Sequence, residues 1–371
     1  MRAAVAHGGG PTAVLNSSLA GVVAGCRGRF SSLLAAPFGL PGFLDGDLRD
    51  LLAVPESRWA EIARAPGSVI GSSRRKLSDA ELDEIAERLR GQGIDVLLLT
   101  GGNGTMGTAL DLTSRGVRVV GVPKTIDNDL LETHHTPGYA STAYFFACAA
   151  RDIEADNRAL PSPICILETL GRNAGWIVAA TALARQDQDD APHLIYVPER
   201  RLGLGRIAAD VEAVYGRLGR CVVAVCEGQL DESGRSFGAD VDRPGDPAHS
   251  LASNLGHTLA QLVSAKLGLR ARAERPGLLG RSCGPYARER DLREAFACGY
   301  EAVLRGADGG SGVMATLDAE GQVGFAVLDA VARRERLLPA EFISTTGNDV
   351  TAAFLEYARP LVGPVPAYAR L

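Results

Sequence analysis

The sequence is built on one recurring pattern: an apolar strand, a glycine-rich turn and an amphipathic helix. The clearest strand is the apolar run at residues 96–99, and it leads into the turn at residues 100–105 (TGGNGT). Ahead of this strand, Ser78 and Glu81 have the spacing of a capping box at the start of a helix. The apolar face of that helix is formed by Leu82, Ile85, Ala86 and Leu89.

Other apolar runs that end in glycine or polar turns predict strands at residues 118–122, 162–167, 194–197, 221–226 and 313–317. Their apolar residues do not alternate with polar ones, which is typical of parallel strands covered by helices on both faces. We therefore expect a doubly wound α/β fold. A domain break is expected near residues 140–160, because a second α/β series begins at Ile164. The Gly-, Pro- and Asp-rich segment 231–250 predicts a surface loop.

Composition excludes several classes of protein. The 44 glycines of the 371 residues follow no collagen-like period, and they suit many tight strand-to-helix turns. A net charge of −5 with scattered Lys and Arg gives no footprint for nucleic acid or an anionic membrane. No signal-peptide region and no apolar run of about 20 residues occurs, so the cytoplasm is the expected location. The cysteines lack CxxC or zinc-ligand spacing, which predicts reduced, buried thiols at Cys26, Cys148, Cys165, Cys221, Cys226, Cys283 and Cys298.

Two glycine-rich loops are candidate phosphate sites. Residues 8–16 (GGGPTAVLN) and 101–106 (GGNGTM) each follow an apolar run and precede a helical pattern. Consecutive glycines let backbone amides approach a ligand, and a helix N-terminus favours anions. Each loop alone is also compatible with a plain tight turn, but two loops on neighbouring parallel strands would face the same crevice. Neither loop is a Walker A or GxGxxG motif, which argues against a P-loop kinase and a dehydrogenase.

Charged residues follow two further predicted strands. Residues 123–129 (PKTIDND) place Lys124, Asp127 and Asp129 at a strand end, where they could supply a phosphate counter-charge, a base and a metal ligand. The alternative for this segment is a polar turn. Arg172 follows the next strand between glycines, where its guanidinium can act as a fork for phosphate or lie on the surface in a helix-start turn.

A basic stretch contains Arg272, Arg275 and Arg281 and is followed by Asp291 and a helical pattern. Charge alone favours a solvated face for this stretch.

Taken together and in this order, the segments resemble the phosphofructokinase family, particularly its pyrophosphate-using branch. The resemblance covers nearly the whole chain, and PKTIDND with GRNAGW is highly specific. The similar segments are GGGPTAVLNSSLAGV, GSSRRKL, GGNGTM, PKTIDND, HTPGYASTA, GRNAGWIVAATALA, LIYVPE, CEG, PGLLGRS and residues 347–363.

The resemblance implies two doubly wound, mainly parallel-sheet, Rossmann-like domains with the active site in the cleft between them. Residues 1–140 plus about 277–308 would bind the phosphate donor, and about 141–276 plus 309–371 would bind the sugar phosphate and supply the C-terminal helices. The implied reaction moves a phosphoryl group from ATP or pyrophosphate to the 1-hydroxyl of fructose 6-phosphate or a related sugar phosphate, with Mg²⁺. A homodimer or homotetramer is implied, because in the family a neighbouring subunit supplies one basic residue of the sugar site.

The resemblance also implies individual roles. Asp127 would take the proton of the sugar's 1-hydroxyl, Thr125 would contact the transferred phosphoryl group, and Arg172 would stabilise the transition state together with Lys124. Donor binding is implied for Gly9, Gly10, Arg74, Gly102, Asn103, Gly104 and Thr105. Acceptor binding is implied for Thr125, Asp127, Asp129, Leu170, Gly171, Arg172, Glu227, Arg272 and Arg281, the last two holding the 6-phosphate. Metal binding is implied for Asp129. It is also implied for Asn103, although an amide is an unusual ligand at that position.

Several positions depart from the family pattern. An acidic metal ligand is common where Asn103 stands, an arginine is expected at residues 162–163, and a glutamine usually occupies the position of Gly280. A different or larger sugar phosphate is therefore an open alternative for the acceptor. These departures also leave open a non-catalytic sugar-phosphate-binding protein, against which the retained Asp127 and Arg172 argue.

The choice of donor depends on two residues. Pyrophosphate users typically carry an aspartate at the position of Gly104 and a lysine at that of Lys124, and this chain has only the lysine. Glycine leaves room for a nucleotide, while the lysine can neutralise a phosphate of either donor. We therefore expect ATP, with pyrophosphate as the alternative. An NAD or lipid kinase with a similar glycine loop is disfavoured by the segments GRNAGW and HTPGY.

Overall fold

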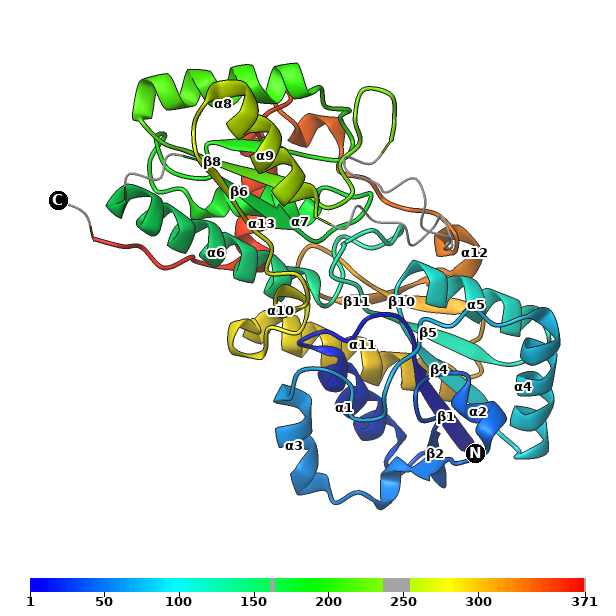
Figure 1. Ribbon diagram of the computed structural model, residues 1–371. Coiled ribbons are helices and arrows are strands. Elements are labelled where there is room, and N and C mark those ends of the chain that lie inside the picture. Colours follow the sequence, from blue (N-terminus) through cyan, green and yellow to red (C-terminus); the bar gives the residue numbers. More distant parts are fainter. Residues whose placement is uncertain (161–163, 236–253, 370–371) are drawn as a thin grey trace. The chain divides into compact units, whose positions relative to one another are not determined.

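The computed structural model describes residues 1–160, 164–235 and 254–369 (Figure 1). The chain forms two compact units: unit 1 is Met1–Ser141 with Arg281–Arg336, and unit 2 is Thr142–Gly280 with Leu337–Leu371. Residues 309–336 thus lie in unit 1, whereas the sequence-based division placed them with the sugar-phosphate domain. The reason is that β10 (Val313–Leu317) joins the sheet of unit 1 beside β5 (Val119–Pro123).

Unit 1 contains a seven-stranded sheet whose five middle strands are parallel and whose two edge strands are antiparallel. The strand order is β11 (Val323–Val327), β10, β5, β4 (Val96–Gly101), β1 (Arg2–His7), β2 (Ser32–Ala35) and β3 (Arg49–Asp50). The strands expected at residues 96–99, 118–122 and 313–317 are confirmed.

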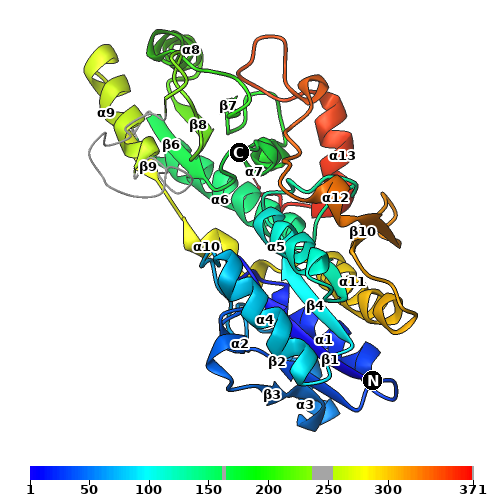
Figure 2. The ribbon, with the colours of Figure 1, turned by 90° about the vertical axis from the view of Figure 1, so that its right-hand side faces the viewer.

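Helices cover both faces of this sheet (Figures 1 and 2). Within β1, Ala3 and Val5 face one apolar core and Ala4 and Ala6 face the other, which explains why residues 3–6 of the strand are all apolar. The first core is closed by α1 (Leu15–Cys26), α3 (Glu56–Arg64) and α11 (Glu289–Ala307). The second is closed by α2 (Gly42–Asp45), α4 (Asp79–Gly91), α5 (Asn103–Ser114) and α12 (Leu328–Val331).

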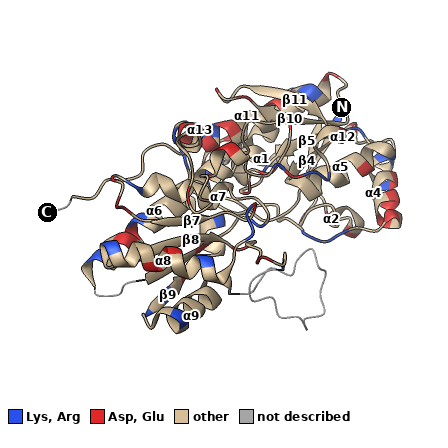
Figure 3. Cartoon of the chain, turned by 90° about the horizontal axis from the view of Figure 1, so that it is seen from above, with Lys and Arg blue, Asp and Glu red and all other residues tan. Residues whose placement is uncertain are grey.

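The local signals at α4 act as the sequence predicted. Ser78 and Glu81 form a reciprocal capping box, and Leu82, Ile85, Ala86 and Leu89 are buried. The opposite face of α4 carries interspersed acidic and basic side chains, as does α8 (Leu204–Leu218) in unit 2 (Figure 3).

Unit 2 contains a four-stranded, fully parallel sheet. Its order is β7 (Leu194–Tyr196), β8 (Cys221–Cys226), β6 (Ile164–Thr169) and β9 (Ala271–Glu274). One face packs against α8 and α9 (Leu255–Leu267). On the other side, α6 (Tyr139–Ala159), which begins in unit 1, contributes Ile153, and α7 (Trp176–Ala180) packs on β7 and β8. The rest of unit 2 includes α13 (Ala352–Val362), whose Tyr357 ring lies 5.1 Å from that of Trp176.

The remaining sequence expectations have mixed outcomes. The strands expected at residues 194–197 and 221–226 are confirmed, and the one expected at 162–167 is β6, whose first two expected residues lie outside the described part. Most of the loop expected at 231–250 also lies outside it. All seven cysteines are buried and free, as predicted. In the described ranges, no helix is long and apolar enough to cross a membrane.

Candidate active site

Three neighbouring strands of unit 1 end at the same edge of the sheet, and three of the predicted loops follow them. The order β5, β4, β1 brings together the ends at Pro123, Gly101 and His7. The amide of Gly8 donates to the carbonyl of Thr100 at 2.8 Å, and the amide of Lys124 donates to the carbonyl of Gly101 at 3.0 Å. Open α/β sheets bind ligands at the carboxyl ends of their strands, where the strand order changes direction. That change occurs at β1, because the next strand in the chain, β2, lies on one side of it and β4 lies on the other.

The first two loops are glycine-rich because they pack against the same threonine. A Cβ atom at Gly8 would lie 2.3 Å from the hydroxyl oxygen of Thr105, and one at Gly101 would lie 2.2 Å from it. Both distances exclude a side chain. Thr105 lies in the first turn of α5, whose N-cap residue, Gly102, has no side chain to occupy the helix N-terminus. The loops therefore expose backbone next to the positive end of a 12-residue helix, as a phosphate site requires.

Lys124 is a buried cation that the first loop holds in place. Its side chain is 2% exposed, and its Nζ donates to the carbonyls of Gly8 at 2.9 Å and Gly10 at 2.7 Å. Burial, together with the weaker effect of repulsion from Arg74 and Arg281, lowers the pKa of Lys124 from 10.5 to about 7. An anionic donor bound here would favour the charged lysine.

Two arginines converge on the same loop. A Cβ atom at Gly10 would lie 2.7 Å from an Nη atom of Arg74 and 2.9 Å from one of Arg281. The resemblance implied donor binding for Arg74 and acceptor binding for Arg281. The structure places both guanidinium groups at the first glycine loop, where they and Lys124 make a strongly cationic site.

The third loop, which we call the catalytic loop (residues 124–129), carries the paired carboxylates. The hydroxyl of Thr125 accepts a hydrogen bond from the amide of Asp127 at 3.1 Å. Burial, together with the weaker effect of the charge on Asp127, raises the pKa of Asp129 from 3.8 to about 7. The Oδ1 atom of Asp129 is buried without a hydrogen-bond partner among the described residues. A buried carboxylate oxygen of this kind is suited to a proton or a cation.

Arg336 holds the backbone of the catalytic loop, and sequence reasoning did not single it out. Its guanidinium donates to the carbonyls of Asn128 at 2.8 Å, Thr133 at 2.6 Å and His134 at 2.8 Å. Its own amide donates to the carbonyl of Asp129 at 2.8 Å. Asn128 is buried with a φ of 54°, so these bonds stabilise an uncommon backbone conformation.

The second loop holds the two residues that depart from the family pattern. The Asn103 amide nitrogen donates to the carbonyl of Arg334, and its buried Oδ1 has no partner among the described residues. At Gly104, no atom lies within 4 Å of the position a Cβ would take, and the residue does not require a positive φ. A side chain at Gly104 therefore meets neither steric nor conformational resistance.

Unit 2 brings together four of the predicted acceptor residues at the carboxyl ends of β6 and β8. Gly171 and Arg172 have φ angles of 134° and 50° in the turn after β6, next to Leu170. The amide of Glu227 donates to the carbonyl of Thr169 at 2.9 Å. Burial raises the pKa of Glu227, and Glu168 adds to this effect, while Arg275 and Arg172 oppose it. Glu227 therefore lies within the electrostatic reach of Arg172.

The basic stretch is divided between the units. Arg272 is exposed in the edge strand β9 and, with His257 and Gln261 of α9, lines a groove of about 540 Å³. Arg275, which sequence reasoning gave no role, pairs with Glu168 at 2.9 Å. Arg281 belongs to unit 1, so the two arginines assigned to the 6-phosphate do not share a compact unit.

Gly280 departs from the family pattern for a steric reason. A Cβ atom there would lie 2.6 Å from the ring of Phe146, so the usual glutamine does not fit without movement of that ring. Residues 162–163, where the family pattern has an arginine, lie outside the described residues.

Comparison with known proteins bears on the family directly. The phosphofructokinase family model matches residues 2–304. The chain belongs to the phosphofructokinase family. It is 37% identical to pyrophosphate–fructose 6-phosphate 1-phosphotransferase of Rhodospirillum rubrum, over 97% of this chain and 93% of the relative. It is 31% identical to a sulfofructose kinase of Alkalicoccus urumqiensis, over 92% of each chain.

A solved structure of a family member has the same fold. The crystal structure of the pyrophosphate-dependent phosphofructokinase of Marinobacter aquaeolei has a TM-score of 0.88 and 28% identity, covering 99% of this chain and 93% of the other. The expected family, α/β fold and phosphotransferase class are thus confirmed. The expected preference for ATP is not supported, because the relatives are named for pyrophosphate and their names favour the alternative donor.

Proposed function

We propose that this protein transfers a phosphoryl group from inorganic pyrophosphate to the 1-hydroxyl of fructose 6-phosphate. The observation that carries the proposal is the buried Lys124, held by the carbonyls of Gly8 and Gly10 in a loop that also meets Arg74 and Arg281. Three cationic groups at one glycine loop suit a compact, highly charged anion. The names of the similar enzymes support the same donor.

The open space at Gly104 does not favour a nucleotide. Room for an α-phosphate is necessary for ATP binding, but it adds no affinity by itself. Gly104 is exposed, so without a nucleotide the space is filled by solvent. The cationic first loop, by contrast, gains most from a donor with its charge concentrated on two phosphates. Charge therefore outweighs sterics in the choice of donor.

The proposed chemistry uses the catalytic loop for proton and phosphoryl transfer. The carboxylate of Asp127 accepts the proton of the sugar's 1-hydroxyl while the hydroxyl oxygen of the sugar attacks the nearer phosphorus of pyrophosphate. The bond to the bridging oxygen breaks, and orthophosphate leaves with that oxygen. Thr125 orients the transferred group, and Lys124 with the loop arginines neutralises the charge on the leaving phosphate. Arg172 of unit 2 is proposed to stabilise the transition state.

Mg²⁺ is a proposed cofactor that the residues of the catalytic loop fit. In the described ranges, no three or more His, Cys, Asp or Glu residues form a metal cage. Mg²⁺ is commonly bound by one or two carboxylates together with substrate phosphates and water, and the unpartnered Oδ1 of Asp129 suits that arrangement. The ion would neutralise charge on the transferred phosphoryl group. The buried Oδ1 of Asn103 is a weaker second candidate, because a neutral amide attracts the ion less.

The acceptor's 6-substituent is the less determined part of the proposal. Glu227 would accept hydrogen bonds from sugar hydroxyls, and Arg272 would bind the substituent, whereas Arg281, to which the resemblance also gave that role, lies at the first glycine loop. Gly280, where Phe146 excludes a larger residue, removes one polar group that the family usually supplies. Fewer donors also suit a sulfonate, which carries a single negative charge, so sulfofructose is a second candidate acceptor, supported by the name of one relative. A homodimer or homotetramer remains a proposal based on the family, and light scattering of the purified protein would test it.

A phosphorus NMR experiment tests the proposed reaction. The purified protein is incubated with pyrophosphate, Mg²⁺ and either fructose 6-phosphate or sulfofructose, and an Asp127→Asn variant serves as control. The proposal predicts one new sugar 1-phosphate resonance and one equivalent of orthophosphate. Orthophosphate without a new ester would identify a pyrophosphatase, and no reaction with either acceptor would refute the proposal.

A further inference from the structure

The catalytic loop rests against a second segment of unit 1, residues 133–138, which we call the backing segment. The amide of Thr125 donates to the carbonyl of Pro137 at 3.2 Å, and the hydroxyl of Thr136 donates to the carbonyl of Thr125 at 2.9 Å. The amide of Thr136 donates to Oδ1 of Asn128 at 3.0 Å. Both ends of the catalytic loop are therefore fixed by the backing segment, and any shift of Thr136 or Pro137 moves Thr125 and Asn128.

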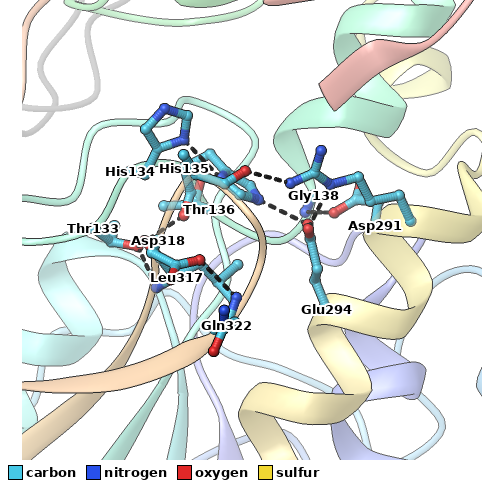
Figure 4. A network of polar contacts seen from close by, with 12 residues as sticks. Thr133, His134, His135, Thr136, Gly138, Asp291, Glu294, Leu317, Asp318 and Gln322 are labelled. Atoms are coloured by element: carbon cyan, nitrogen blue, oxygen red, sulfur yellow. Dashed lines mark hydrogen bonds and ion pairs between the residues drawn. The ribbon is translucent and has the colours of Figure 1, made fainter. Parts of the chain in front are cut away.

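Two carboxylates of α11 hold the backing segment in turn (Figure 4). Asp291 accepts from the amide of Gly138 at 2.8 Å and from the hydroxyl of Ser141 at 2.6 Å. Three residues later on the same helix face, Glu294 meets the Nε2 atom of His135 at 2.8 Å. Asp291, Glu294 and His135 are all buried. The sequence of contacts thus runs from α11 through His135 to the loop that carries Asp127.

Both ring nitrogens of His135 make a contact. Glu294 is also bound by Arg290 at 2.6 Å, and hydrogen bonds from His135 and Arg290 hold its pKa below the ordinary value although burial opposes this. A carboxylate requires a donor, so Nε2 of His135 carries a proton. The Nδ1 atoms of His134 and His135 lie 3.0 Å apart, which leaves room for one proton between them. Both ring nitrogens of His135 are therefore used.

We propose that His135 is a positioning residue for phosphoryl transfer, acting through its hydrogen bond to Glu294 to fix the backing segment and hence the catalytic loop. His135 touches no reacting group itself. This inference rests on the proposed function for its kinetic test only, because the placement of the catalytic loop is a property of the free protein.

The position of His135 distinguishes this role from a contribution to stability alone. A half-buried imidazole elsewhere in the chain, His193, accepts a hydrogen bond from the amide of Val222 at 2.8 Å. It directly precedes β7, at the opposite end of the unit 2 sheet from the strand ends that carry Arg172 and Glu227. Loss of either histidine removes a hydrogen bond that is at least partly buried. Only loss of His135 should displace groups that take part in the reaction, so His193→Phe is the matched control.

The test compares His135→Phe, which keeps a ring but loses both nitrogens, with His135→Gln, which keeps an N–H donor for Glu294. In folded protein, we expect His135→Phe to lower kcat by about 10- to 100-fold with the acceptor KM changed less than about twofold, because small displacements of catalytic groups act on turnover. His135→Gln should restore kcat to within about threefold of wild type, and His193→Phe should leave it unchanged. An unchanged kcat in His135→Phe, or an equal loss in His193→Phe, would overturn the proposal.

Hydrogen exchange supplies a second readout that does not depend on the substrate. Peptides containing residues 124–129 should exchange faster in His135→Phe than in wild type, since the amide of Thr125 is bonded to Pro137. Unchanged exchange there would contradict the proposal even if the proposed reaction is wrong. Should His135→Phe fail to fold, Glu294→Gln takes its place. It keeps the side-chain volume, weakens the same bond, and should lower kcat and protection in the same direction.

Discussion

Replacement of Lys124 by methionine should stabilise the protein at neutral pH while it abolishes donor binding. The pKa of Lys124 falls from 10.5 to about 7 on folding, chiefly through burial. Each unit corresponds to about 1.4 kcal/mol, so the charged lysine costs the folded state at most about 5 kcal/mol below pH 7. Methionine removes that cost but leaves the carbonyls of Gly8 and Gly10 without donors, a loss of about 1 kcal/mol each. The expected net gain is roughly 2–3 kcal/mol at pH 6.5.

The pH dependence makes this prediction specific. Because the folded pKa lies below the unfolded one, the unfolded wild type binds more protons between pH 7 and 10.5, and wild-type stability rises with pH over that window. The advantage of Lys124→Met should therefore shrink by about 3 kcal/mol between pH 6.5 and 9.5. Urea denaturation of both proteins at these two pH values measures the difference, and titrating groups that do not interact with Lys124 cancel in the comparison. A negative difference at pH 6.5, or a difference that does not change between the two pH values, would show that Lys124 is not a destabilised cation.

Three further predictions concern turnover and substrate binding. Asp127→Asn should lower kcat by about 10²- to 10⁴-fold without loss of folding, and a variant with near-normal steady-state turnover would remove Asp127 from the mechanism. Gly104→Asp should fold like Gly104→Ala, because its side chain meets open space. It should retain pyrophosphate turnover, while any ATP turnover falls at least tenfold, or about 1.4 kcal/mol. Equal losses of turnover with both donors would place residue 104 away from the α-phosphate. Arg272→Ala should raise the acceptor KM by loss of a charge-assisted contact worth about 1.5–3 kcal/mol, with Arg270→Ala as the nearby control. An unchanged acceptor KM in Arg272→Ala would make Arg272 a solvated side chain.

Local signals allowed much of the fold to be predicted from the sequence. The capping box at Ser78 and the unbroken apolar runs of β4 and β8 are fixed by residues near one another in the chain. The edge strands β9 and β11 escaped notice for the opposite reason. In β9, the alternation of Ala271 and Ala273 with charged residues resembles a solvated stretch, and β11 is largely exposed. Neither has the apolar run by which the inner strands are recognised.

The site was predictable only where its residues follow strands. Lys124, Asp127 and Arg172 stand directly after apolar runs, so their positions at strand ends could be inferred. Arg336 and Glu294 act through contacts with residues more than 150 positions away, and no local pattern signals them. Sequence reasoning favoured ATP because it weighed the space at Gly104 above the burial of Lys124, which the sequence does not reveal. The cytoplasmic location stays a prediction.

The central claim is that pyrophosphate is the phosphoryl donor. The most direct test is the ratio of kcat/KM for pyrophosphate to that for ATP, measured with the same acceptor, Mg²⁺ and purified protein. We predict a ratio above about 100, which corresponds to about 2.7 kcal/mol of differential transition-state binding. The ratio should collapse in Lys124→Met, since that variant lacks the buried cation of the first loop. A ratio near or below one in the wild type would contradict the account and restore ATP as the donor.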